Sequence, residues 1–121
     1  MATKTKPKTT VAPIPVVQGF CPMPDIAKLI GGKWKLIILQ ILIFQGMKRF
    51  NELRHEINTI TQTMLTNQLR ALEKDGLVKR KVYAEVPPRV EYTATPRAIA
   101  LEQVFLAMHD WWMEDSKRNT V

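Results

Sequence analysis

The residues best suited to bind another molecule stand on one side of a predicted helix. Leu65, Leu69 and Leu72 recur at helical spacing after Thr61, which predicts a helix running to about Lys74. Helical periodicity places these leucines in one narrow stripe and turns a polar set nearly the other way, namely Thr63, Asn67, Arg70 and Lys74. Hydroxyl, amide and guanidinium groups on such a face can hydrogen-bond to base edges in duplex DNA. A merely solvated helix face would have a similar composition.

Base edges are usually met near the start of a reading helix, where this sequence places Gln62, Thr63, Thr66 and Asn67. A bidentate Arg on guanine is the commonest specific contact, so we expect that role for Arg70. Gln62 or Asn67 could read adenine by the same geometry. Thr61 is expected to cap the helix and to lie at the same surface.

A basic hairpin is predicted directly after this helix. Asp75-Gly76 ends the helix, and the segments Leu77 to Ala84 and Arg89 to Thr95 are predicted strands. They are joined by Glu85-Val86-Pro87-Pro88, where prolines suit a turn. The cations of this hairpin, expected to contact the DNA backbone, are Lys79, Arg80, Lys81 and Arg89. A helix followed by a basic hairpin favours a winged helix on DNA.

Two earlier helices are expected to position this surface. Prolines around Cys21 to Asp25 suit a first turn, and Gly31-Gly32 ends the short helix that follows. The segment Lys33 to Phe44 is apolar almost all round, which is typical of a central buried helix, and Gly46 marks its end.

A third helix is predicted from about Arg49 to Ile57, with Phe50, Leu53 and Ile57 on one face. The three residues 58–60 leave enough chain for a tight turn before Thr61, so the pair predicts a helix-turn-helix. We place Lys48 and Arg49 at the start of this helix, where free N–H groups and the helix dipole favour a phosphate.

The last predicted helix begins after Pro96 and has more apolar surface than the core of one small domain needs. This surplus predicts a homodimer that packs through its terminal helices, and paired aromatic residues are common at such contacts. The expected interface residues are Ile99, Val104, Phe105, Met108, Trp111 and Trp112. The alternative is a terminal helix that closes the core of a monomer.

Length and composition limit the class of protein. A chain of 121 residues fits one domain, and 18 Lys and Arg against 11 Asp and Glu give a net charge of +7 that favours a polyanionic partner. We expect a mobile basic tail over residues 1–20 and one DNA-binding and dimerisation domain over residues 21–118. The longest apolar run, Leu36 to Phe44, has about half the ~20 residues that span a bilayer, so no membrane partner is expected. No export signal is evident, and we expect a cytoplasmic protein.

Cys21 is the single cysteine of the chain. A thiol at a helix N-terminus has a stabilised thiolate, so an oxidant or small electrophile could act as an effector there. Any disulfide must join Cys21 of two subunits or a small thiol. The alternative is a small buried residue that helps to start the helix.

Several separate motifs, in order, resemble the HxlR-type transcriptional regulators, a group similar to the larger MarR group. They are Cys21-Pro22, Gly31-Gly32-Lys33-Trp34, Arg49-Phe50-Asn51-Glu52-Leu53, the run Leu72 to Val78 and the run Pro87 to Tyr92. The resemblance implies a small dimeric winged-helix protein that binds operator DNA as a repressor or activator. It also implies that a cysteine matching Cys21 serves some members as a sensor of electrophiles, quinones or hypochlorite.

The chain departs from this pattern at two places. It has Thr59-Ile60-Thr61 where the family usually has Gly-Ile-Ser before the recognition helix. It has Ala94-Thr95 and Ala98 where the family often has Leu-Thr and a later Gly. These changes leave the approach angle of the recognition helix open.

The sequence thus predicts an α+β fold, mainly α with a small β-hairpin wing, in a winged helix-turn-helix that dimerises through its terminal helices. The expected function is a repressor that binds a near-palindromic double-stranded DNA operator. The alternative is a winged-helix protein-interaction module without DNA binding. Catalysis is not expected, because nothing brings His55 or His109 to Cys21, and neither a metal nor another cofactor is expected.

Overall fold

A computed structural model describes residues 22–119 of the chain, so Cys21 and the expected basic tail over residues 1–20 lie outside the described residues. Its helices are α1 Met23–Ile30, α2 Lys33–Gln45, α3 Phe50–Ile57, α4 Gln62–Lys74, α5 Pro96–Ile99 and α6 Glu102–Asn119. Its strands are β1 Lys48–Arg49, β2 Val78–Tyr83 and β3 Arg89–Ala94. The fold is therefore mainly helical with one small antiparallel sheet, as predicted. Over residues 22–119 we find no helix with the length and apolar character that crossing a membrane requires.

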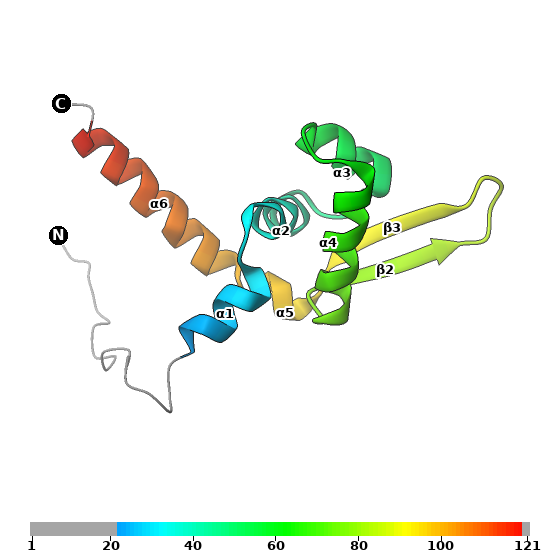
Figure 1. The fold of residues 1–121 in the computed structure, drawn as a ribbon, viewed down its shortest axis with the longest axis horizontal. Coiled ribbons are helices and arrows are strands. Elements are labelled where there is room, and N and C mark those ends of the chain that lie inside the picture. Colours follow the sequence, from blue (N-terminus) through cyan, green and yellow to red (C-terminus); the bar gives the residue numbers. More distant parts are fainter. Residues whose placement is uncertain (1–21, 120–121) are drawn as a thin grey trace.

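Helix α2 occupies the centre of the molecule, between α6 on one side and the α3–α4 pair on the other (Figure 1). Ile38, Leu39 and Leu42 of this helix are almost completely buried, with Leu53 of α3 in the same core. Burial on several sides explains why the α2 sequence is apolar nearly all round.

Helices α3 and α4 form the predicted helix-turn-helix. The Thr61 hydroxyl oxygen accepts the N–H of Met64 at 3.1 Å, which confirms the predicted cap. Ile60, just before the cap, and Leu65 in the first turn are both buried in the core. These are the two positions that a hydrophobic staple pairs to fix the entry of a chain into a helix.

The C-terminal end of α4 is closed by glycine. Gly76 has a φ of +78°, which an L side chain rarely adopts. The Leu77 N–H donates to the Leu72 carbonyl at 2.9 Å and the Gly76 N–H donates to that of Glu73 at 3.0 Å. This Schellman arrangement reverses the chain into β2.

The sheet has the order β1-β3-β2. The hairpin of β2 and β3 was predicted, but β1 was not. Lys48 pairs with Tyr92 and Arg49 pairs with Glu91, so both residues lie in a strand and α3 begins only at Phe50. Arg49 is also the N-cap of α3, so it stands at the start of this helix as predicted, with Lys48 one residue before it. The strand itself was not predictable, because a two-residue strand has no periodicity of its own and forms only where β3 offers an edge.

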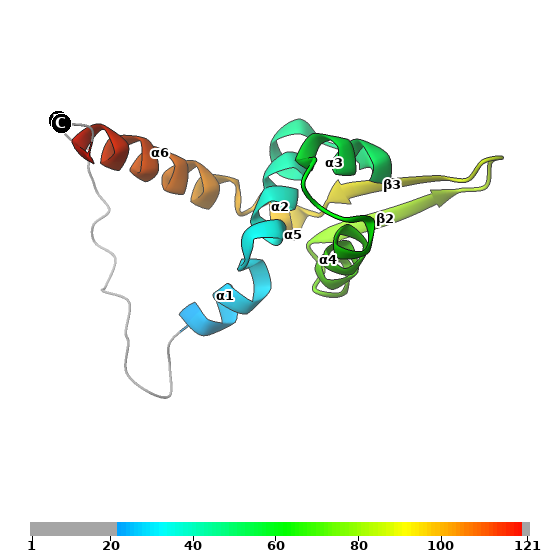
Figure 2. The same ribbon diagram turned by 45° about the horizontal axis from the view of Figure 1, so that its top comes forward.

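The single terminal helix that we predicted is two helices. The Thr95 hydroxyl caps α5 by accepting the Ala98 N–H at 3.3 Å. After Ile99 the chain tightens, because the Leu101 N–H donates to the Ala98 carbonyl three residues back, at 2.8 Å. Beyond this break α6 extends away from the core, on the side opposite the hairpin (Figures 1 and 2).

Candidate nucleic-acid interface

Helix α4 presents a polar face outward. Leu65, Leu69 and Leu72 are at most 1% exposed and anchor the helix to the core. The side chains expected to meet base edges lie on the other side: Gln62, Thr63, Asn67 and Arg70 are exposed, and Thr66 is half-buried. The structure therefore brings the predicted reading residues together on one rigid helix, with the first turn uncovered.

Thr61 has a structural duty at the start of this face. Its oxygen accepts the Met64 N–H, as described above, while the residue itself stays exposed. A hydroxyl can donate and accept at once, so the Thr61 O–H remains a donor for a partner outside the helix.

The hairpin, here called the wing (Val78–Ala94), divides its cations between two faces. Register pairs Lys79 with Thr93, Lys81 with Glu91 and Arg80 with Tyr92. Side chains alternate along a strand, so Lys79 and Lys81 share a face while Arg80 points to the other. All three cations are exposed. A phosphate backbone that passes along one face of the wing can thus meet at most part of the set.

Arg89 is engaged within the wing. Its guanidinium lies 4.0 Å from the ring centre of Tyr83, its partner in the register. It also makes ion pairs with Glu85 at 3.2 Å and with Glu91 at 3.4 Å. We call Tyr83, Glu85, Arg89 and Glu91 the wing clamp. Sequence reasoning missed it, although the i, i+4 spacing of Glu85 and Arg89 was visible.

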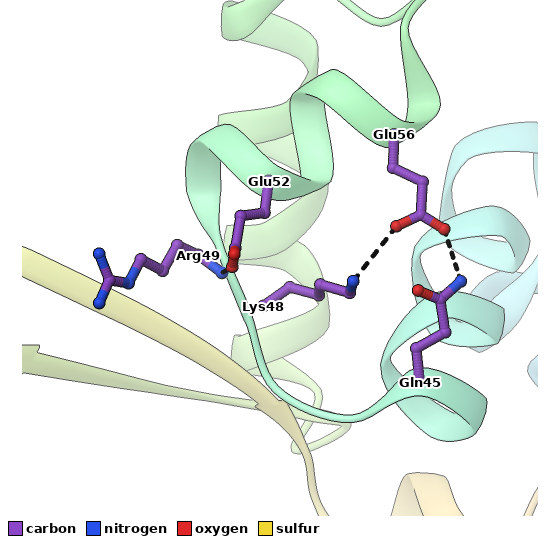
Figure 3. A network of polar contacts seen from close by, with 5 residues as sticks. All are labelled: Gln45, Lys48, Arg49, Glu52 and Glu56. Carbon is purple, nitrogen blue, oxygen red and sulfur yellow. Dashed lines mark hydrogen bonds and ion pairs between the residues drawn. The ribbon is translucent and has the colours of Figure 1, made fainter.

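The N-terminal end of α3 is occupied by protein groups (Figure 3). The Glu52 carboxylate accepts the Arg49 N–H at 2.7 Å. We expected this N–H to be free for a phosphate, and it is not. Lys48 Nζ lies 3.4 Å from a Glu56 carboxylate oxygen, and the Gln45 amide donates to the other oxygen of Glu56. The Arg49 guanidinium extends away from this network and is exposed.

Helix α6 exposes apolar side chains on much of its surface. Trp111 and Trp112 are each 61% exposed, and their ring centres lie 6.5 Å apart. Ile99, Val104 and Met108 are also exposed, as an interface requires, and so are Leu106 and Met113, which the sequence analysis did not select. Phe105 differs from these residues: at 8% exposure it packs in the core of one chain, because the first turn of α6 still packs there, and it also lines the groove between α2 and α6.

A groove runs between α2 and α6. It has a volume of about 840 Å³, and its lining includes Leu36, Phe44, Met108 and Trp112. Because these side chains are apolar, water contact at this groove is unfavourable in an isolated chain.

Comparison with known proteins agrees with this architecture. A family model described as HxlR-like helix-turn-helix matches residues 29–120. The chain is 54% identical over 91 residues to the HTH-type transcriptional regulator YdeP of Bacillus subtilis (strain 168), a match that covers 75% of this chain and 70% of YdeP.

Solved structures are similar as well. The redox regulator HypR in its oxidised form matches with a TM-score of 0.72 and 48% identity, covering 78% of this chain and 96% of HypR. A MarR-family transcriptional regulator from Enterococcus faecalis V583 matches with a TM-score of 0.72 and 38% identity, covering 88% of this chain and 98% of that one. The chain described here therefore belongs to the HxlR-like helix-turn-helix family of transcriptional regulators and has the winged-helix fold.

Proposed function

We propose that the protein is a homodimeric repressor that binds a near-palindromic DNA operator. The observation that carries this proposal is the two-sided character of α4, whose leucines are buried while Gln62, Asn67 and Arg70 stay exposed. A merely solvated helix face does not require basic residues beside it, but here a wing with three exposed cations follows the helix directly. This pairing of a reading helix with basic flanks is the footprint of a DNA-binding module.

Base reading is assigned to α4 in the major groove. Arg70 forms a bidentate pair with guanine, and Gln62 or Asn67 reads adenine. Thr61, Thr63 and Thr66 supply further hydroxyl donors at the same surface. Under this proposal Arg70→Ala costs about 1–3 kcal/mol of binding and relaxes specificity at one base. Equal losses on operator and random DNA would exclude Arg70 as a base reader.

Phosphate contact is assigned to the exposed cations Lys79, Arg80, Lys81 and Arg49. Lys48 and Arg89 have protein carboxylates as partners, so we assign them lesser roles. Lys81→Ala should weaken binding to all sequences alike and lower the salt slope by about 1, because one phosphate contact is lost.

The homodimer is assigned to α6, whose exposed apolar residues and groove against α2 would be covered by a second copy. A two-fold axis then places two copies of α4 in successive major grooves, with half-sites about one turn of DNA apart. The near-palindromic operator follows from this symmetry.

The experiment that tests the function is selection of bound sequences from random duplex DNA. A palindromic motif, bound with an affinity that falls steeply with salt, supports the repressor assignment once the site is shown to silence a reporter promoter. Enrichment of no motif, together with a protein partner bound in a salt-insensitive way, would favour the interaction module instead.

Oxidant sensing through Cys21 is a second proposal. It is supported by the similarity to HypR, a redox regulator, and by the presence of only one cysteine in the chain. The same selection is repeated after diamide or hypochlorite treatment. Loss of the motif on oxidation, and its retention in oxidised Cys21→Ser, supports the switch, whereas a motif indifferent to oxidation in the wild type excludes it.

A further inference from the structure

Three consecutive carbonyl groups after the recognition helix accept hydrogen bonds from the segment that starts α5. The Thr95 N–H donates to the Leu77 carbonyl at 3.1 Å, and the Thr95 hydroxyl donates to that of Gly76 at 2.7 Å. The Arg97 guanidinium donates to the carbonyl of Asp75, the C-cap of α4. We call these three contacts the α4–α5 staple.

The polar groups of the staple are well paired. The Thr95 hydroxyl donates to Gly76 while it accepts the Ala98 N–H, so both of its functions are used. Arg97 places a positive charge at the negative end of the α4 dipole, which strengthens its hydrogen bond. The Arg97 nitrogen lies 3.8 Å from the place where a Cβ of Gly76 would stand, so this turn fits closely against the guanidinium.

The staple connects the reading helix to the proposed dimer helix. Ala98 of α5 is fully buried, which fixes α5 in the core, and only two residues separate the end of α5 from the start of α6. In both views of the ribbon α5 lies between the base of α6 and the C-terminal end of α4 (Figures 1 and 2). A change in the direction of α6 therefore reaches α4 through a short path that includes the staple.

We propose that Thr95 and Arg97 are positioning residues that set the angle of α4 relative to α6, and thereby the half-site spacing that the dimer accepts. This inference rests on the proposed function. With 13 residues, α4 is about 20 Å long. A tilt of about 10° at its C-terminal end moves its reading end by about 3.5 Å, close to the rise of one base pair of about 3.4 Å. Loss of the staple therefore changes register along DNA without changing the reading residues.

The test measures the affinity of the full-length protein for duplexes whose two half-sites are moved together or apart by single base pairs. The variants are Arg97→Ala, Arg97→Lys and Thr95→Val, with Arg118→Ala as a control that removes one exposed cation at the far end of α6. Thermal unfolding of each variant shows that it is folded.

We expect the wild type and Arg118→Ala to have the same sharp optimum of spacing. Arg97→Ala and Thr95→Val should lose about three- to tenfold in affinity at that optimum, because binding there must hold α4 at the wild-type angle without one of its hydrogen bonds. They should lose less at neighbouring spacings. Their base preference within each half-site and their salt slope should equal those of the wild type. Arg97→Lys keeps the charge and a donor, so it should lie between the wild type and Arg97→Ala.

Four results overturn the inference. Equal loss at every spacing means that the staple only stabilises the fold, and a salt slope lowered by about 1 in Arg97→Ala means that Arg97 contacts a phosphate. If the wild type binds one half-site without any spacing preference, the proposed binding of a dimer to two half-sites is excluded, and the inference is excluded with it. A sharp wild-type optimum that the staple variants share leaves the proposed function intact and excludes the inference alone.

Discussion

The wing clamp gives a prediction about Arg89, which the sequence marks as a phosphate contact and the structure places among protein groups. If Arg89 holds the wing together, Arg89→Ala should lower the free energy of unfolding and leave the number of phosphate contacts unchanged. If Arg89 contacts DNA instead, Arg89→Ala should remove one phosphate contact and leave the free energy of unfolding unchanged. The two roles are therefore separable by two measurements on one variant.

The magnitude follows from the three contacts of the guanidinium. The ion pair with Glu85, whose side chain is 48% exposed, contributes about 0.5 kcal/mol or less. The pair with Glu91, 16% exposed, contributes about 0.5–1 kcal/mol, since burial reduces screening. The contact with the Tyr83 ring adds about 0.5–1 kcal/mol. Arg89→Ala should therefore lower the free energy of unfolding by about 1–2 kcal/mol.

The assay pairs urea denaturation with operator binding at several salt concentrations. Lys79→Ala is the matched control, because Lys79 is exposed and lies on the same face of the wing. For Lys79→Ala we expect unchanged stability and a salt slope lowered by about 0.9, whereas Arg89→Ala should leave the slope nearly unchanged. A slope lowered by about 0.9 in Arg89→Ala, with unchanged stability, would refute the clamp.

Three further changes test other parts of the structure. Thr61→Ala removes the cap of α4 and should lower the free energy of unfolding by about 1 kcal/mol, while Thr61→Ser should restore most of it; denaturation curves of the two variants decide this. Leu69→Ala leaves a cavity beneath the reading helix and should cost about 2–5 kcal/mol by the same measurement, a loss below 1 kcal/mol being inconsistent with its burial. Leu106→Glu places a charge on the exposed apolar face of α6 and should shift the protein from dimer to monomer in sedimentation, without loss of helicity in circular dichroism. A dimer as stable as that of the wild type would argue against α6 as the interface.

The reading surface could be predicted because its signals are local. Three leucines at helical spacing, a capping Thr61 and the Gly76 stop define α4 within about one turn of its bounds, and the structure confirms each. The stop at Gly76 and the proline turn over residues 85–88 likewise bounded the strands that the structure shows as β2 and β3. The departure at Thr59 to Thr61 did not disturb the start of α4, because a threonine caps as a serine does.

Other features depend on groups that are distant in the sequence. Nothing near Phe105 distinguishes a core side chain from its exposed neighbours, so its burial was not predictable from the spacing of α6. The break before α6 lies at Leu101, which packs against the core, and no proline or glycine marks it. The network of Lys48 with Glu56 likewise forms only because β1 pairs with β3 and turns Lys48 toward α3.

By itself the sequence determined the order of helices and wing, the exposed polar face of α4, the positive charge and the apolar surplus of the last helix. These properties depend on periodicity, caps and composition, which act over a few residues. Only the tertiary structure decided which cations are free and which are held, with Arg89 held in the wing clamp and Lys48 held by Glu56. It alone decided that Thr95 and Arg97 fasten the end of α4, because hydrogen bonds between distant segments exist only once the core has brought them together.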